Sequence, residues 1–204
     1  MSNRDSDRGT ELGVCPLSRA RLEILKKSGF NPKALEADTR RERFSENTTP
    51  EAALIIAKRI SERIISQHRQ KSGLLACVDT ETFYDGRIRN EPKHHSELKE
   101  WVAHYGRHPE IPIRNVTSIV LTNLESGACA EGSEEADVYF NCFDAPYIVE
   151  YIAKNKRFLE CPCGFQISHE LWKPRLNKEK LPENIDCVHG MPMDLFLDLM
   201  KKVS

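Results

Sequence analysis

One short apolar run sets the main constraint on how this chain can fold. Residues 74–78 read Leu-Leu-Ala-Cys-Val and include no polar side chain. A strand of this kind has no side suited to water, so it predicts a sheet that is covered on both faces. The run ends at Asp79-Thr80, and open α/β sheets place their ligands at the ends of such strands. The sequence therefore predicts an α/β protein with a ligand cleft beside Asp79.

The flanking segments predict helices and further strands around this run. The clearest helix begins near Pro50 and carries apolar residues at three- and four-residue steps from Ala53 to Ile64. Asp85-Gly86 predicts a hairpin turn. The other predicted elements are strands at 12–15, 116–124 and 136–143, helices at 19–28, 96–105, 146–155 and 193–202, and an exposed loop at 38–43. Hairpin and crossover spacings together predict a mixed sheet, in one domain from residue 12 to 204 after a disordered lead at 1–11.

The charge balance excludes one large class of function. Thirty basic and 31 acidic residues leave a net charge of −1, whereas proteins that hold polymeric nucleic acid by its phosphates carry a basic excess. No apolar run is long enough to cross a bilayer, and the polar first ten residues contain no signal-peptide core. Seven cysteines, an odd number, favour reduced thiols over a disulfide framework. We expect a cytoplasmic protein that binds neither polymeric nucleic acid nor membrane.

Two candidate sites follow from residue types and their positions. Ser18 stands where a helix begins, and backbone N–H groups there, with Arg19 and Arg21, can hold phosphate. The alternative is that Ser18 only caps the helix and the arginines are solvated. Asp79 can bind Mg²⁺, or orient and deprotonate a water molecule. The alternative is that it caps the turn after its strand.

A zinc site is a third candidate. Its four soft ligands would be Cys161, Cys163, Cys187 and His189. Their one-residue gaps are tighter than the usual spacing, so buried reduced cysteines are the competing interpretation. His104 and His108, one helical turn apart, can also chelate a metal. Gly106 between them favours a frayed helix end with surface histidines instead.

Several short motifs, taken in order, resemble the Maf family, the septum formation inhibitor group of nucleoside triphosphate pyrophosphatases. The resemblance runs from about Gly13 to Val203. Its N-terminal and central motifs are Ser18-Arg19-Ala20-Arg21, Val78-Asp79-Thr80, and Asp85-Gly86 followed by Glu91-Pro92. Its later motifs are Gly106-Arg107, Val116-Thr117-Ser118 and Gly190-Met191-Pro192.

The resemblance implies a Maf/inosine-triphosphatase-like fold, with two lobes, a mixed β-sheet, flanking helices and a central cleft. Members of the family bind a nucleoside triphosphate with Mg²⁺, Mn²⁺ or a similar divalent cation. They hydrolyse it to the monophosphate and pyrophosphate, often act on pyrimidine or modified nucleotides, and often form homodimers. We expect the same activity and the same cation here.

The resemblance also implies roles for individual residues. Asp79 would bind the cation and help to activate the attacking water, and Glu91 is a second candidate metal ligand. The residues that it places at the substrate are Ser18, Arg19, Arg21, Lys58, Thr80 and Lys93.

Five polar positions depart from the family pattern. An arginine is replaced by Ala20, an acidic pair by Arg40-Arg41, two lysines by Ile60 and Glu91, and a glutamine by Ser168. In this chain, residues of the expected type stand close to three of these positions: Glu42, Lys58 and Gln166. At about 6 Å and an effective dielectric near 20, exchanging a lysine for Glu91 beside a triphosphate changes the interaction by about 6 kcal/mol. An active enzyme then needs a metal bound to Glu91, or the Lys93 side chain in the position of the missing lysine. The alternative function is a catalytically impaired Maf-like regulator that binds a nucleotide or a protein partner.

Overall fold

The apolar run at residues 74–78 forms the first half of a long central strand, β3 (Leu74–Tyr84). The structure is a computed structural model that describes residues 11–36, 49–67 and 72–204, so all but the last residue of the predicted lead at 1–11 and the whole predicted loop at 38–43 lie outside the described residues. The prediction that the strand ends at Asp79 is wrong. Asp79 pairs with Ser118 in an antiparallel ladder that continues unbroken to Tyr84, because backbone pairing does not require apolar side chains.

The sheet is mixed, as the spacings predicted. Its strand order is β2-β1-β3-β5-β6, with the short β4 (Arg87–Ile88) paired to β3. β1 (Leu12–Cys15) runs parallel to β3 and to β2 (Pro32–Ala34), and β2 is too short to have been predicted. β5 (Ile113–Asn123) and β6 (Cys129–Val138) are antiparallel to their neighbours.

The last strand, β6, begins earlier than its apolar residues indicate. The predicted strand at 136–143 overlaps it only at its end, and Phe140 forms an isolated bridge to Leu176. β6 is an edge strand whose first residues alternate between exposed and half-buried. Strand periodicity therefore shows only where β6 enters the core, at Ala136 and Val138.

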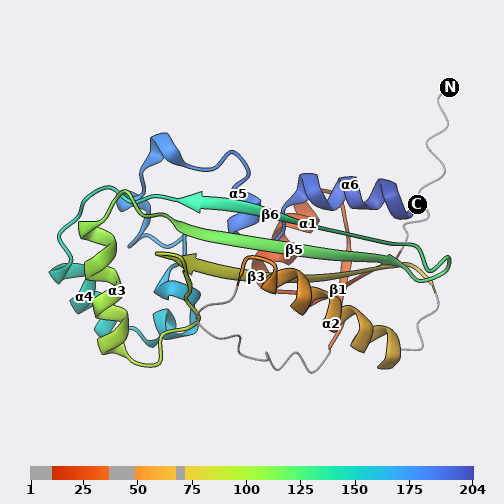
Figure 1. The fold of residues 1–204 in the computed structure, drawn as a ribbon, viewed down its shortest axis with the longest axis horizontal. Helices are drawn as coiled ribbons and strands as arrows, with labels where there is room; N and C mark the ends of the chain where they lie inside the picture. Colours follow the sequence, from red (N-terminus) through yellow and green to blue (C-terminus); the bar gives the residue numbers. More distant parts are fainter. Residues whose placement is uncertain (1–10, 37–48, 68–71) are drawn as a thin grey trace.

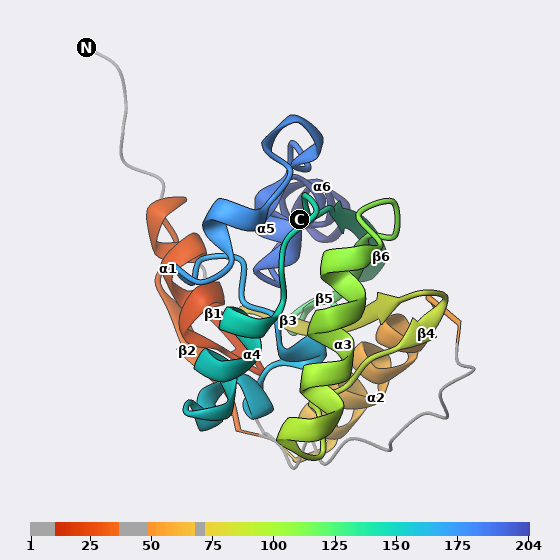
Figure 2. The same ribbon diagram turned by 90° about the vertical axis from the view of Figure 1, so that its left-hand side faces the viewer.

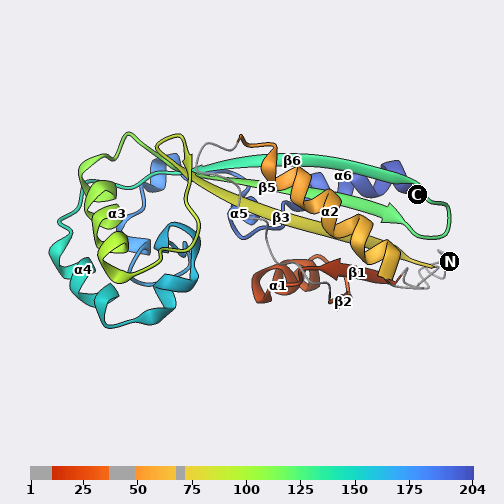
Figure 3. The same cartoon turned by 60° about the horizontal axis from the view of Figure 1, so that its bottom comes forward.

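Helices cover both faces of the sheet (Figures 1 and 3). α2 (Ala52–Gln67) packs Ile56, Ile60 and Ile64 against one face, which confirms its predicted apolar stripe. α1 (Arg19–Lys27) and α6 (Met193–Val203) cover the other face, and the short α5 (Ile185–Val188) lies over its middle.

A second lobe lies beyond the far ends of β3 and β5, and Figure 2 views it end-on. It contains α3 (His95–Arg107), α4 (Pro146–Ala153) and several single-turn 3₁₀ segments between residues 156 and 180. Trp172, Tyr105 and Phe140 are each at most 1% exposed and form the centre of its core.

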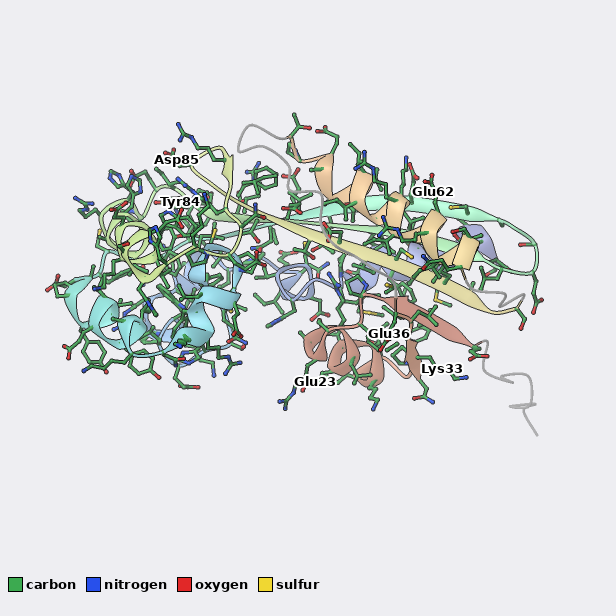
Figure 4. The ribbon with its side chains drawn as sticks, turned by 90° about the horizontal axis from the view of Figure 1, so that it is seen from below. Glu23, Lys33, Glu36, Glu62, Tyr84 and Asp85 are labelled. Carbon is green, nitrogen blue, oxygen red and sulfur yellow. The ribbon has the colours of Figure 1, made fainter. Side chains whose placement is uncertain are left out.

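The long strands join the two lobes. Leu74 of β3 belongs to the core under α6, whereas Tyr84 at its other end belongs to the core of the second lobe. Figure 4 shows Tyr84 and Asp85 at that far end, away from Glu62 on α2. The Asp85-Gly86 hairpin is confirmed, with φ of 52° and 70° at its two turn residues. No helix among the described residues is long and apolar enough to cross a membrane.

The packing of α6 generates a first prediction. Phe196 is fully buried and meets Phe30 edge to face at 5.3 Å between ring centroids, so Phe196→Ala leaves a cavity. We expect the free energy of unfolding to fall by about 3–5 kcal/mol in urea denaturation, with an unchanged slope. The control is Leu197→Ala on the same helix, since Leu197 is 40% exposed. Equal losses from both variants would contradict the described packing of α6.

Candidate functional site

The site lies where one edge of β3 loses its strand partner. β1 pairs with β3 as far as Cys77, and β4 begins to pair with it at Phe83. In the described part of the chain, residues 78–81 have no strand on this edge. Because β1 turns away here into α1, a ligand can approach β3 from the side, as at the switch points of other α/β sheets.

Arg21 fills the start of this gap and fastens three distant segments. Its Nε donates to the Gly190 carbonyl at 2.7 Å, its Nη1 to the Pro16 carbonyl at 2.8 Å, and its Nη2 to Thr80 Oγ1 at 3.2 Å. The side chain is buried, with 7% exposure for the residue. Gly190 has φ of 80°, and a Cβ there would lie 3.0 Å from Thr80 Oγ1 and 3.2 Å from the guanidinium, so glycine lets the chain approach.

The start of α1 stands beside this guanidinium. Ser18 Oγ accepts a hydrogen bond from the Arg21 backbone N–H at 3.2 Å, which confirms the predicted cap. The cis Cys15-Pro16 peptide bond lies in the turn between β1 and this helix. The first turn of α1 carries no acidic residue, so its positive dipole end is not neutralised locally.

A cavity of about 340 Å³ opens between the two lobes next to α1. Its first wall comes from the start of α1 and the turn after α5, including Ser18, Arg21 and Gly190. Its opposite wall comes from residues 162–167 of the second lobe. Larger hollows lie between α3 and α4 and beside the β3–β4 hairpin, but Ser18, Arg21 and Thr80 line neither of them.

The floor of the cavity is polar where the rest of the sheet face is apolar. Thr80 and Thr82 of β3 pair in register with Thr117 and Asn115 of β5, so all four side chains share one face. Thr80 and Thr117 hydroxyls are 2.9 Å apart, Thr117 Oγ1 donates to the Cys187 carbonyl, and Thr82 Oγ1 donates to Asn115 Oδ1. This polar patch separates the cores of the two lobes.

Asp79 belongs to the opposite face of the same strand. It has the parity of Leu75, Cys77 and Phe83, which pack on the α2 side. Asp79 and Glu81 are 2% and 4% exposed. Both lie where β3 has no strand partner on the β1 side, so they border the same gap as Thr80. They do not line the cavity.

The structure brings Ser18, Arg21 and Thr80 together and places the other predicted substrate residues elsewhere. Arg19 is 92% exposed and pairs with Glu23. Lys58 pairs at 2.7 Å with Glu131 on β6, two strands away from β3.

The two residues that the sequence offered in place of the missing lysine also lie outside the cavity. Glu91 and Lys93 are both exposed and follow β4, and the Lys93 backbone N–H donates to Glu97 Oε2 at 2.7 Å. Neither side chain lines the cavity.

The carboxylates at the gap suit the kind of cation that the family resemblance implies. Mg²⁺ keeps several waters and takes one or two protein carboxylates together with substrate phosphates. Asp79 and Glu81 can supply such carboxylates from one face of β3. Among the residues described, no group of three or more His, Cys, Asp or Glu side chains forms a complete protein cage for a metal.

The candidate zinc site does not form, and the competing interpretation of buried cysteines fits Cys163 and Cys187. All four proposed ligands lie in described parts of the chain, and they do not form a cluster that could hold a metal. Cys187 Sγ instead lies 3.2 Å from the Glu134 carbonyl, and Cys163 is fully buried in the second lobe. His189 lines the cavity, where burial lowers its pKa and keeps the imidazole neutral at pH 7.

The histidine pair lies in a regular helix end. The frayed end predicted at Gly106 is wrong, because α3 continues to Arg107 while Gly106 packs against Phe143. His104 and His108 stack with centroids 4.1 Å apart, and His104 Nδ1 is 2.7 Å from the Tyr84 hydroxyl. They are not part of the cavity.

Sequence reasoning missed several residues of the site. Thr82 and Asn115 line the cavity and were not singled out, His189 was named only as a candidate zinc ligand, and Gln166 only as a neighbour of Ser168, which is exposed. A usable signal was present in Thr80-x-Thr82 and Asn115-x-Thr117. These are alternating polar residues in strands that are otherwise buried on both faces.

Comparison with known proteins agrees with this geometry. The model of the family described as "Maf-like protein" matches residues 16–203. The chain belongs to the Maf-like protein family. It is also 22% identical over 191 residues to a protein of Dictyostelium discoideum named 7-methyl-GTP pyrophosphatase, with 90% of this chain and 92% of that protein covered. The resemblance inferred from the motifs is thus confirmed, and the cavity of this Maf-like protein is built from three of those motifs.

The Arg21 contacts generate a second prediction. In Arg21→Lys an ammonium replaces the planar fork and cannot reach Gly190, Pro16 and Thr80 together. We expect unfolding free energy to fall by about 2–4 kcal/mol in urea denaturation, since hydrogen bonds from a buried charged group are lost. Arg19→Lys on the same helix is the control and should change stability little. Full stability of Arg21→Lys would show that these contacts do not hold the segments together.

The thiols generate a third prediction. Burial raises the pKa of Cys163 to about 12 and of Cys187 to about 11, whereas Cys129 and Cys142 are exposed. Because the thiolate is the reacting species, iodoacetamide at pH 8 should label Cys129 and Cys142 and leave Cys163 and Cys187 unmodified in the native protein. Peptide mapping by mass spectrometry measures this. Labelling of Cys163 or Cys187 that appears only after chelation would restore the zinc hypothesis.

Proposed function

We propose that this chain is a nucleoside triphosphate pyrophosphatase. It hydrolyses a nucleoside triphosphate to the monophosphate and pyrophosphate. The observation that carries the proposal is the cavity between the lobes, which places the start of α1 beside a polar sheet floor and is built from the Maf-like motifs. The name of the Dictyostelium relative, a 7-methyl-GTP pyrophosphatase, supports the same reaction class.

The phosphates occupy the end of the cavity nearest Ser18. The first backbone N–H groups of α1 and the positive end of its dipole favour an anion at this point. The Arg21 guanidinium adds a fixed positive charge, although its hydrogen bonds serve mainly to hold Pro16, Thr80 and Gly190 in place. This local potential suits a chain whose net charge is only −1.

The reaction needs water and a charge-stabilising environment. An oxygen of water attacks phosphorus, the bond between the α-phosphoryl group and the bridging oxygen breaks, and pyrophosphate leaves with that oxygen. The proton released by the water passes to a base, and Asp79 is the carboxylate at the gap to which we assign this role. Asp79 is 2% exposed, so its carboxylate is shielded from bulk water.

A bound Mg²⁺ or Mn²⁺ would neutralise charge on the phosphates. Asp79 is the proposed protein ligand, and Glu81 lies next to it on the same face of β3. Glu91, the second ligand expected from the sequence, has an exposed position after β4. Neither Glu91 nor Lys93 lies in the cavity in place of the lysine that this chain lacks.

We further propose a cytoplasmic setting and a homodimer. None of the seven cysteines, which all lie in the described part of the chain, forms a disulfide, and this suits a reducing compartment. The dimer rests on the family resemblance, and light scattering after size-exclusion chromatography tests it.

A pyrophosphate-release assay tests the activity and is the fourth prediction. With Mg²⁺ or Mn²⁺, the wild-type chain should turn over at least one of UTP, CTP, GTP, ATP and 7-methyl-GTP. Asp79→Asn keeps the size of the side chain but removes its charge and basicity, so we expect kcat/KM to fall about 100-fold or more.

Asp198→Asn is the matched control for this assay. Asp198 is an exposed aspartate on α6 that pairs with Lys201, so its substitution should leave turnover unchanged. No turnover of any triphosphate by the wild type would contradict the proposed activity. Turnover that survives Asp79→Asn would contradict only the role assigned to Asp79.

A further inference from the structure

Two buried amide atoms in the cavity lack hydrogen-bond partners. Asn115 Nδ2 and Gln166 Oε1 are both buried, and neither has a partner among the residues that the structure describes. Asn115 is 5% exposed and Gln166 is partly buried, and both side chains line the same cavity. A buried polar atom without a partner destabilises a folded protein, so two in one cavity require an explanation.

The Asn115 amide lies with its carbonyl oxygen toward Thr82. Thr82 Oγ1 donates to Asn115 Oδ1 at 3.2 Å, and in this orientation the NH₂ group is left for another acceptor. Thr82 and Asn115 face each other in the β3–β5 ladder, so rigid strands hold this donor. The missing partner of Asn115 is therefore an acceptor, and the missing partner of Gln166 Oε1 is a donor.

The position of this pair separates it from the phosphate end. Thr80 contacts Arg21, and Thr82 lies two residues further along β3, about 7 Å toward the second lobe. Phe165 and Ile167 flank Gln166 in the cavity wall and provide apolar surface, and no aspartate or glutamate lines the cavity. An apolar wall with one donor and one acceptor suits a flat, uncharged heterocycle whose edge carries both a donor and an acceptor.

We propose that Asn115 Nδ2 and Gln166 Oε1 read the hydrogen-bonding edge of the nucleobase, and that Asn115 is a specificity-determining residue. This inference rests on the proposed function, because it places the base of the triphosphate beyond the phosphate end. Uracil and cytosine, and likewise guanine and adenine, exchange a carbonyl for an amino group at one edge position. A fixed donor distinguishes those two groups, since the wrong one leaves a buried atom without a partner.

The experiment compares bases by binding and by turnover. Calorimetric titration with UMP, CMP, GMP and AMP needs no hydrolysis, and pyrophosphate release from the matching triphosphates measures kcat/KM. We expect the wild type to discriminate within at least one carbonyl/amino pair by about tenfold or more. Asn115→Leu, which has similar size and no polar atom, should bring that ratio close to one in both measurements.

Two further variants keep the test decisive. Thr82→Val frees the Asn115 amide to rotate and should lower the ratio while leaving the chain folded, so it replaces Asn115→Leu where the latter does not fold. Thr122→Val makes an equivalent polar-to-apolar change on β5 outside the cavity and should leave the ratio unchanged.

The outcomes separate the inference from the proposed function. Base-selective binding that Asn115→Leu abolishes, without turnover by the wild type, supports the inference and overturns the pyrophosphatase activity. Turnover with a base ratio that survives Asn115→Leu and Thr82→Val overturns the inference and assigns the two amide atoms to bound water. Wild-type binding and turnover that are equal for all four bases overturn it as well.

Discussion

The Arg21 guanidinium is the contact on which the arrangement of the cavity depends. It joins the turn before α1, the middle of β3 and the turn after α5, and the last of these lies 169 residues from Arg21 in the chain. Apolar packing of Leu17, Val78 and Met191 already brings these segments into one core, whereas the sheet face at Thr80 is polar. There a planar group with several fixed donors sets the positions, since each carbonyl or hydroxyl it meets is held at one distance and angle.

The second requirement is a gap in the sheet. At residues 78–81 of β3, β1 has ended and β4 has not begun, so residues of both faces of one strand border the same gap. Thr80 turns toward the cavity and Asp79 toward α2. An arrangement that places buried carboxylates and unpartnered amides in the middle of a sheet is less stable than an apolar one. Proteins keep such features where a ligand uses them.

The sequence predicted the elements whose residues face apolar surroundings and misplaced those whose surroundings are polar. The stripe of α2 and the cap at Ser18 were correct, because periodicity and capping are local properties. β3 was predicted to end at Asp79, since a buried aspartate looks like a strand end when its strand partners are unknown. The start of β6 was predicted too far along the sequence, since the first residues of this strand show no apolar pattern.

The site residues were also predicted only where a local motif marks them. Ser18, Arg21 and Thr80 belong to motifs that can be recognised along the chain, and the structure places them together. Asn115 and Gln166 are 51 residues apart, and nothing in either segment indicates that they meet in one cavity. The zinc hypothesis failed because residues that are close in sequence lie apart in the structure. Cys163 and Cys187 are near in sequence, but Cys163 is buried in the core of the second lobe, whereas Cys187 belongs to α5 and contacts Glu134 of β6.

The long strands also limit how this protein can move. β3, β5 and β6 pass from the first lobe toward the second as a continuous hydrogen-bonded ladder, in place of a flexible linker. Hinge closure uses a few residues whose backbone angles can change freely, and paired strands do not allow such changes. Opening and closing of the cleft must therefore come from bending of the sheet or from the turns at 162–167 and 188–190. Selection among substrates then depends chiefly on the shape that the cavity has before binding. A nucleotide that does not fit this shape does not bind.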